Sequence, residues 1–408
     1  MKHERLEAAP CVECLDAEGL AQLDAAEWDD LSANALVENP FYSHEVILAG
    51  LETIDSGTPL EALAIRGSER RLLGLFPFRR RRLPFETADA ACNLYQHSCT
   101  PLIRREHALP VLSAWLDAVR GAGDLPRFWR FRHMHLDSRF VELLHGALPA
   151  RSLRSVAVSF YRRPHLTRLE SGIESHLQQV LPKRRLKDIQ RNIRRLRELG
   201  SLRFERARDA ALVERRLEQF LELENSGWKG ERGTAFLSNS KDAAFARAAF
   251  APREDGTRLV TIDSLLLDDR PLAVSINLQA RDTAFTPKGA YDERYRSYCP
   301  GLVLEYLVIK AFYEDSETVD MDAATTEDGH VLQGFWNDWK AMGTVIAGPD
   351  DWRLGVTMAA ARCAYALRAC AKRVFGLGRH LFRKAGKPWG NWARTVPWAI
   401  GLVAICAE

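Results

Sequence analysis

Residues 291–315 read YDERYRSYCPGLVLEYLVIKAFYED, and this stretch decides the fold, because a polar loop leads through Pro300-Gly301 into an apolar helix. The residues before it predict an antiparallel meander of three strands, at 258–267, 271–280 and 283–291. A short strand is expected after the helix, at 319–321. This order places the N-terminus of a helix at the end of a strand.

The start of this helix has the chemistry of an anion site. A helix N-terminus has four backbone N–H groups without partners and a partial positive charge, and both favour phosphate. Pro300 suits a first turn that needs no N–H, and Gly301 allows a ligand close to the backbone. The alternative is an ordinary connection between a strand and a helix, since a Pro-Gly start is common in turns.

Upstream of the meander, helical and extended segments alternate. A strand is expected at 153–163, and helices at 183–198, 210–224 and 239–251. The stretch 183–203 holds nine basic and two acidic residues. Between the second and third helices lies the polar, glycine-broken run NSGWKG at 225–230.

The first 150 residues predict an α/β domain of their own. A polar turn separates two apolar runs at 60–66 and 72–79, which indicates a hairpin, and two helices at 105–120 and 138–148 flank a strand at 127–136. We therefore expect an N-terminal domain at 1–155, a second domain at 156–350 and a basic tail at 351–408.

The run at 291–315 resembles the coenzyme-A-binding loop and helix of a bacterial acetyltransferase family in the GNAT superfamily. That family includes acetyltransferases encoded with cellulose-biosynthesis genes (CelD-like) and is related to the FemABX peptidyltransferases. Three further stretches match in order: LPKRRLKDIQRNIRRLRELG, LELENSGWKGERGTAF and LVTIDSLLLDDRPLAVSINLQARDTAFTPKGAYDERY. The resemblance covers about 160–345 and implies an α/β fold of tandem GNAT-like domains, with mixed, mostly antiparallel sheets flanked by helices and a degenerate first half.

The resemblance also implies roles for particular residues. The acyl-CoA donor would bind at the helix start, through Arg296, Ser297, Tyr298, Pro300, Gly301 and Leu302. The candidates for proton transfer are Glu224, Asp263 and Asp320 as bases and Tyr295 as the acid. The residues expected near the acceptor amine are Trp228, Lys229, Lys288 and Tyr291. Each carboxylate has a structural alternative: Glu224 as a helix-end charge, Asp263 as a solvent-facing strand residue and Asp320 as a strand-end cap.

The chain departs from the family pattern after residue 319. It keeps acidic residues at Asp320 and Asp322, but a longer turn, Asp328-Gly329-His330, replaces the expected one. Trp339-Lys340 stands near the usual Tyr-Lys pair, in a segment, 331–342, that we expect to be helical. This departure leaves the identity of the acceptor open. No His lies near Cys299, which argues against an acyl-cysteine mechanism.

Composition places the chain among ordinary globular proteins, with 46% hydrophobic and 27% charged residues. The eight cysteines are scattered, and only Cys11 and Cys14 have C-x-x-C spacing without a second pair, so no metal is expected. Free thiols and the absence of an apolar N-terminal segment favour the cytoplasm.

Two elements are strongly basic. The helix at 183–198 carries a charge run of the kind that usually forms a solvated face, and no recognition motif accompanies it, which argues against nucleic-acid binding. Residues 352–407 hold ten Lys or Arg and no Asp or Glu. A helix at 354–384 would be amphipathic, and Trp389, Trp392 and Trp398 follow it. This pattern is typical of a segment in a membrane interface, so 354–405 is a candidate contact with the inner face of the membrane; packing on the protein's own body is the alternative.

The sequence thus predicts N-acyl transfer from acetyl-CoA or another acyl-CoA to a small-molecule or lipid-linked amine, in cell-envelope or polysaccharide biosynthesis. Two alternatives remain. One is a FemABX-like transferase that uses aminoacyl-tRNA, and the other is a non-catalytic GNAT scaffold in a membrane-bound complex.

Overall fold

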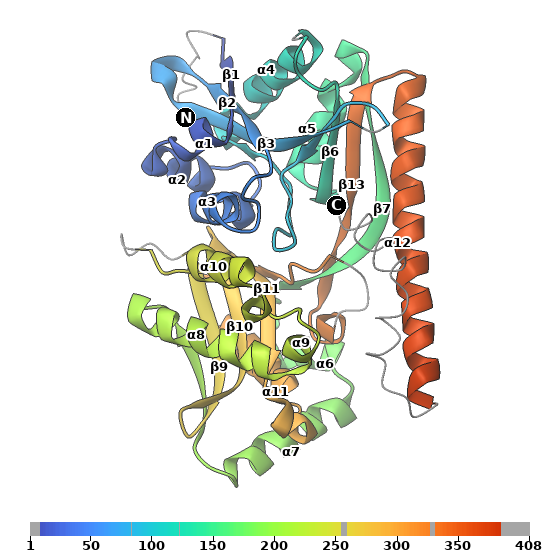
Figure 1. Ribbon diagram of the computed structural model, residues 1–408. Coiled ribbons are helices and arrows are strands. Elements are labelled where there is room, and N and C mark those ends of the chain that lie inside the picture. Colours follow the sequence, from blue (N-terminus) through green and yellow to red (C-terminus); the bar gives the residue numbers. More distant parts are fainter. Residues whose placement is uncertain (1–8, 83, 122, 254–258, 327–330, 385–408) are drawn as a thin grey trace.

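The structure is a computed structural model that describes residues 9–82, 84–121, 123–253, 259–326 and 331–384 (Figure 1). It has an upper and a lower half in the view of Figure 1, joined by two long strands, with the helix α12 along one side.

The N-terminal half begins with a strand and short helices and continues with strands and helices in alternation. Its strands are β1 (Cys11–Leu15), β2 (Glu61–Arg66), β3 (Leu72–Arg81), β4 (Thr87–Ala90), β5 (Leu102–Ile103) and β6 (Phe128–His135). Its α-helices are α1 (Ala17–Ala21), α2 (Ala25–Ala33), α3 (His44–Glu52), α4 (Ala108–Gly121) and α5 (Arg139–Ala147). The expected hairpin and the two helices around β6 are confirmed. The strands β1, β4 and β5 were not predicted from the sequence.

The C-terminal half has the predicted order of helices, meander, helix and strand. Its strands are β7 (Leu153–Thr167), β8 (Leu202–Ala207), β9 (Val260–Leu267), β10 (Arg270–Ala280), β11 (Thr283–Tyr291), β12 (Asp320–Asp322) and β13 (Asp338–Pro349). Its α-helices are α6 (Gly172–Val180), α7 (Lys183–Arg197), α8 (Ala210–Ser226), α9 (Trp228–Glu231), α10 (Ser240–Ala249), α11 (Pro300–Glu314) and α12 (Trp352–Lys384). Single 3-10 turns lie at Pro40–Tyr42 (η1), Ser68–Arg70 (η2), Arg105–His107 (η3), Pro149–Arg151 (η4), Phe236–Ser238 (η5), Glu293–Tyr298 (η6) and Val331–Gly334 (η7).

Within the described residues the strands form one continuous sheet, in the order β1-β2-β3-β4-β6-β13-β7-β12-β11-β10-β9-β8, with β5 beside β3. Neighbouring strands are antiparallel except for the pairs β4–β6 and β11–β12. The expected fold class, a mixed and mostly antiparallel α/β fold flanked by helices, is confirmed. The boundary near residue 155 stays a prediction, because a single sheet runs through both halves.

The strand β13 corrects the sequence analysis. The expected helix at 331–342 is wrong: only Val331–Gly334 forms a 3-10 turn, and β13 begins at Asp338. β13 enters the sheet of the N-terminal half, where it pairs antiparallel with β6 and with nearly all of β7. Its apolar side chains Met342, Val345 and Ile346 are buried there. Since β7 also reaches β12 at its far end, these two strands tie the halves together.

Helices cover both faces of the sheet in the C-terminal half. On one face, α8 and α10 pack with Phe220 and Phe245 against β9–β11, and α3 of the N-terminal half adds Val46 to the same core. On the other face, α6, α7 and α11 pack against the meander, with Val303 and Ile309 of α11 fully buried. The helices α3 and α10 lie in contact, so residues of both halves share one core (Figure 1).

The predicted tail helix is present as α12. Its first turns pack on β6, β7 and β13 through Leu354, Met358 and Ala361, and the Tyr365 hydroxyl lies 2.7 Å from Thr344 Oγ1. Trp389, Trp392 and Trp398 lie outside the described residues. In the part of the chain that the structure describes, no helix is long and apolar enough to cross a bilayer.

Candidate functional site

The strands β11 and β12 separate at the centre of the C-terminal half. They pair in parallel only between Thr283–Phe285 and Asp320–Asp322. A bulge in β11 opposite Asn277 follows, and β11 then continues to Tyr291 beside β10 alone. Within the described residues, the edge of β11 from Thr286 to Tyr291 therefore has no strand partner on the β12 side. Free backbone groups on such an edge can bind an extended ligand.

A ladder of side-chain hydrogen bonds fixes the bulge on the α11 side of the sheet. The Thr286 hydroxyl donates to Asn277 Oδ1 (2.9 Å), and Asn277 Nδ2 donates to Asp263 Oδ2 (3.0 Å). The Arg206 guanidinium then donates to both oxygens of Asp263, at 2.7 and 3.0 Å. Asp263 is completely buried, so the alternative of a solvent-facing residue is wrong. Its carboxylate is held two strands away from the open edge of β11.

The expected donor-binding residues lie together where β11 ends. Arg296, Ser297 and Tyr298 belong to η6, and Pro300, Gly301 and Leu302 form the first turn of α11. Cys299 precedes the helix in the left-handed conformation (φ 50°) and gives no side-chain cap. Leu302 N donates to the Cys299 carbonyl at 3.0 Å. A Cβ atom on Gly301 would meet only Tyr291, at 3.7 Å, so the turn is open to a ligand.

On the other face, the end of α8 and the short helix α9 bring two of the expected side chains together, Glu224 and Lys229. Glu224 is buried and accepts from Lys229 Nζ (2.7 Å) and from Phe236 N (2.9 Å). Lys229 Nζ also reaches the Gly289 carbonyl on β11 (3.4 Å). Glu224 is thus an ion-paired residue beside the open strand edge, not a solvated helix-end charge.

Lys288 is the cation of this group that lies deepest. It follows the bulge of β11, and its ammonium lies over the rings of Tyr95 (4.8 Å) and Phe236 (4.7 Å). Burial lowers the pKa of Lys288 to about 8, while Glu224 raises it and Lys229 lowers it further. No hydrogen bond from this ammonium occurs among the described residues. The Lys288 side chain is half-buried, and a cation without an acceptor beside the open strand edge is a candidate for contact with a substrate.

The remaining expected residues lie around this group or apart from it. Trp228 is 41% exposed, and its backbone N–H donates to Glu293 Oε1 (2.9 Å). Tyr291 is 40% exposed and adjoins Gly301.

Asp320 is the first residue of β12, and His165 Nε2 lies 3.1 Å from its Oδ1 atom. Desolvation opposes ionisation of Asp320, but His165 and Lys340 outweigh it and lower its pKa.

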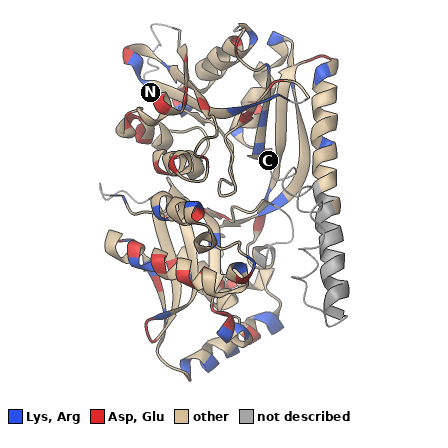
Figure 2. Cartoon of the chain, viewed as in Figure 1, with Lys and Arg blue, Asp and Glu red and all other residues tan. Residues whose placement is uncertain are grey.

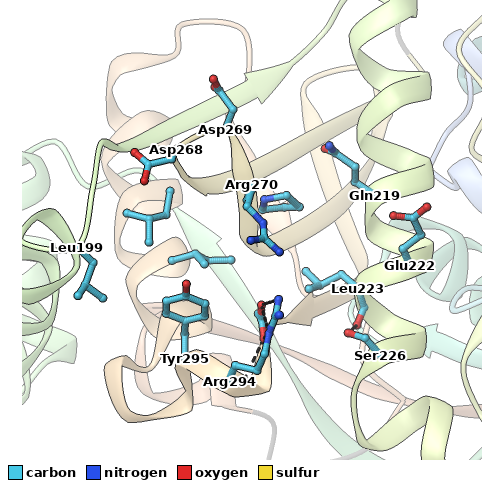
Figure 3. Close-up of a pocket in the computed structure, with 14 residues that line it drawn as sticks. Leu199, Gln219, Glu222, Leu223, Ser226, Asp268, Asp269, Arg270, Arg294 and Tyr295 are labelled. Carbon is cyan, nitrogen blue, oxygen red and sulfur yellow. Dashed lines mark hydrogen bonds and ion pairs between the residues drawn. The ribbon is translucent and has the colours of Figure 1, made fainter.

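Tyr295 faces a cavity of about 590 Å³ between α8, the β9–β10 turn and η6 (Figure 3). The other side chains at this cavity include Arg270, Glu222 and Arg294, which pairs with Asp292 at 2.6 Å. This cavity lies on the β10 side of β11, whereas the open strand edge faces β12. Tyr295 therefore lies on the β10 side of β11, and its role as the acid stays a prediction.

A charge cluster that the sequence did not reveal lies beside the point where β11 and β12 separate. Asp322 of β12 accepts from Lys340 Nζ (3.1 Å) and lies 3.4 Å from the Arg163 guanidinium. Burial would raise the pKa of Asp322, but Arg163 and Lys340 outweigh it and lower it to about 2. Arg163 also donates to the carbonyl of His97, in a loop of the N-terminal half. The sequence signal for this cluster was the presence of charged residues within otherwise apolar strands. A sequence alone does not show which of its charged residues are buried and which are solvated.

A second missed residue is Glu305, one turn beyond Gly301 on α11. The Trp336 indole donates to its carboxyl at 2.5 Å, and burial raises the pKa of Glu305 to about 7. Among the described residues, no set of three or more His, Cys, Asp or Glu side chains could hold a metal ion.

Comparison with known proteins agrees with this architecture. Residues 183–327 match the family model of an acetyltransferase (GNAT) domain. The crystal structure of FemX superposes with a TM-score of 0.54 at 12% identity, over 82% of this chain and 96% of that one. A Bacteroides thetaiotaomicron protein of unknown function gives 0.49 at 12% identity, over 80% and 98%, and L-PGS from Bacillus licheniformis gives 0.48 at 12%, over 83% and 95%.

No curated protein matches the chain in sequence. The chain has a GNAT-like fold, and its residues 183–327 match the model of a GNAT acetyltransferase domain. The narrower resemblance to the cellulose-associated family stays a prediction.

Proposed function

We propose that the protein is an N-acyltransferase that moves an acyl group from acyl-CoA to a primary amine. The observation that carries this proposal is the open edge of β11, which runs from the bulge at Thr286 to Tyr291 and ends beside the uncapped start of α11. A phosphopantetheine thioester fits this layout, with its phosphates at the Gly301 turn and its arm along the strand edge.

The reaction then needs no metal or covalent intermediate. The amine nitrogen attacks the thioester carbonyl carbon, the C–N bond forms, and the C–S bond breaks. The amine loses one proton and the departing thiolate gains one. A backbone N–H at the bulge can stabilise the oxyanion; Thr286 and Lys288 have one each, and Pro287 has none.

We assign the acceptor side to the face of α8 and α9. Glu224, Lys229 and Lys288 adjoin the open edge there, so Glu224 is the proposed base. Asp263 anchors the bulge and Asp320 is paired with His165, so we assign these two to positioning. Tyr295 faces the cavity on the β10 side, which leaves the thiolate to take its proton from solvent.

The test is release of free CoA from acetyl-CoA in the presence of a panel of primary amines, with amide formation followed by mass spectrometry. We expect turnover in the wild type and loss of at least a hundredfold in Gly301→Glu, because the side chain would occupy the phosphate turn. Gly355→Glu is the matched control, since Gly355 is exposed on α12 and nothing lies within 4 Å of its Cβ position. Equal turnover in wild type and Gly301→Glu would refute the proposed donor site.

A further inference from the structure

The helix α7 has a concentrated cationic face. Seven of its side chains are exposed and basic: Lys183, Arg184, Lys187, Arg191, Arg194, Arg195 and Arg197. At about 100° per residue they fall within about 160° of arc, opposite the buried Ile189, Asn192 and Leu196. In Figure 2 the ribbon of α7, at the lower end of the molecule, carries much of its length in blue. We call this set of side chains the α7 cationic face.

This charge is barely compensated within the protein. In the described ranges, Arg191 alone of the seven makes an ion pair, with Asp188 at 2.9 Å on the same helix. Like charges three and four residues apart on a helix repel one another and destabilise it. An anionic partner would relieve this repulsion, so the face is suited to association.

The position of α7 connects this face to the proposed donor site. The Arg195 guanidinium lies 4.5 Å from the centre of the Tyr298 ring. Tyr298 belongs to η6, which leads into the Gly301 turn, and α7 also contacts α11. A partner bound along α7 is therefore adjacent to the turn proposed to hold the donor phosphate.

The extent of the face favours a compact partner. α7 has 15 residues and is about 22 Å long. Carboxylates border its C-terminal end: Glu198 follows the helix, and Asp268 of the β9–β10 turn accepts from Ser201 N at 2.8 Å. A long phosphate backbone extending past this end would meet these carboxylates, whereas one acidic helix fits along the face.

We propose that the α7 cationic face docks an acidic carrier protein that presents the acyl group on a phosphopantetheine arm. The inference rests on the proposed function, because it uses the same thioester, the same phosphate turn and the same open edge of β11. Coenzyme A and the carrier share the arm and differ in what it is attached to. On transfer, the C–S bond to the carrier's arm breaks, the amide C–N bond forms, and the carrier leaves as the free thiol.

The experiment measures binding of a purified acidic bacterial acyl carrier protein, in its holo form and in its apo form without the arm, by isothermal titration calorimetry at 50 and 200 mM salt. The test variant is Arg184→Glu/Lys187→Glu/Arg191→Glu, which spares Arg195 next to Tyr298. The control is Arg82→Glu/Arg105→Glu/Arg120→Glu, which makes the same charge change at exposed residues of the N-terminal half.

We expect both carrier forms to bind the wild type and the control, the holo form more tightly, with at least tenfold weaker binding to the α7 variant and weaker binding at higher salt. Absence of carrier binding, or equal binding to the α7 variant, would overturn the proposal. The proposal would also be overturned if a 20-base-pair RNA duplex, or vesicles with anionic phosphatidylglycerol, bound through α7 more tightly than the carrier does.

Thermal stabilisation by coenzyme A is measured in the same variants, because it separates the two proposals. If coenzyme A stabilises the α7 variant as much as the wild type while carrier binding to the variant is lost, the result supports both the donor site and the docking surface. If coenzyme A does not stabilise the wild type but the carrier still binds, the proposal of an acyl-CoA donor is refuted and the proposal of a docking surface on α7 is supported.

Discussion

At the scale of single residues, Asp322 is the buried anion between the buried Arg163 and the half-buried Lys340. We expect Asp322→Asn to lower the free energy of unfolding by about 3–5 kcal/mol, because it leaves the buried Arg163 and its neighbour Lys340 without their anion. Urea unfolding at pH 7 measures this loss. Asp137→Asn, at an exposed carboxylate, is the control and should change little.

The same residue predicts a pH dependence. The pKa of Asp322 is lowered from 3.8 to about 2 in the folded protein, so its stabilisation is complete above pH 3.8 and is lost as the pH falls through about 2. This difference corresponds to about 2 kcal/mol. We expect the free energy of unfolding to fall less steeply between pH 4 and 2 in Asp322→Asn than in the wild type. Parallel curves would contradict the buried ion pair.

Replacement of Lys288 should make the fold more stable and acyl transfer slower. Its pKa is lowered from 10.5 to about 8 in the folded protein, so the charged form opposes folding below pH 8, and this cost fades as the pH rises through 10.5. We expect Lys288→Met to raise the free energy of unfolding at pH 7 by up to about 3 kcal/mol, with the gain shrinking toward pH 10.5. Acyl transfer by the same variant should fall at least tenfold. A stable variant with full transfer would show that Lys288 serves packing alone.

At the scale of elements, the sequence predicted the helices and strands that depend on residues within the same segment. The prediction was wrong where the structure of a segment depends on strands that are distant in the chain. The meander, α7, α8 and α11 follow from apolar periodicity and turn residues within each segment. The segment 331–342 was assigned to a helix, because its strand character depends on β6 and β7, which are distant in sequence. For the same reason, the sequence did not reveal the cluster of Arg163, Asp322 and Lys340, whose first member lies far from the other two in the chain.

The packing of β13 against β6 is testable at Gly348. A Cβ atom there would lie 2.4 Å from Phe128 Cδ1 and 3.3 Å from the Arg127 carbonyl. We expect Gly348→Ala to lower the free energy of unfolding by about 1–3 kcal/mol through overpacking. In the control Gly146→Ala, on α5, nothing lies within 4 Å of the new atom, so the change should be neutral or slightly stabilising. Two variants of equal stability would contradict the observed register of β13.

At the scale of the whole molecule, the shared sheet predicts joint unfolding. β13 lies between β6 and β7, and one core combines Val46 of α3 with Phe220 and Phe245 of the other half. We expect far-UV circular dichroism and tryptophan fluorescence to give coincident urea transitions. Two separated transitions would show that the halves fold independently, as the expected boundary near residue 155 would suggest.

The turn at Gly301 is the proposed site for the phosphates of an acyl-CoA donor. The most direct test is thermal unfolding of wild type, Gly301→Glu and Gly355→Glu with and without coenzyme A. At 100 times its dissociation constant, the ligand should stabilise the wild type and Gly355→Glu by about 2.7 kcal/mol and leave Gly301→Glu unshifted. No shift in the wild type, or an equal shift in Gly301→Glu, would contradict the account.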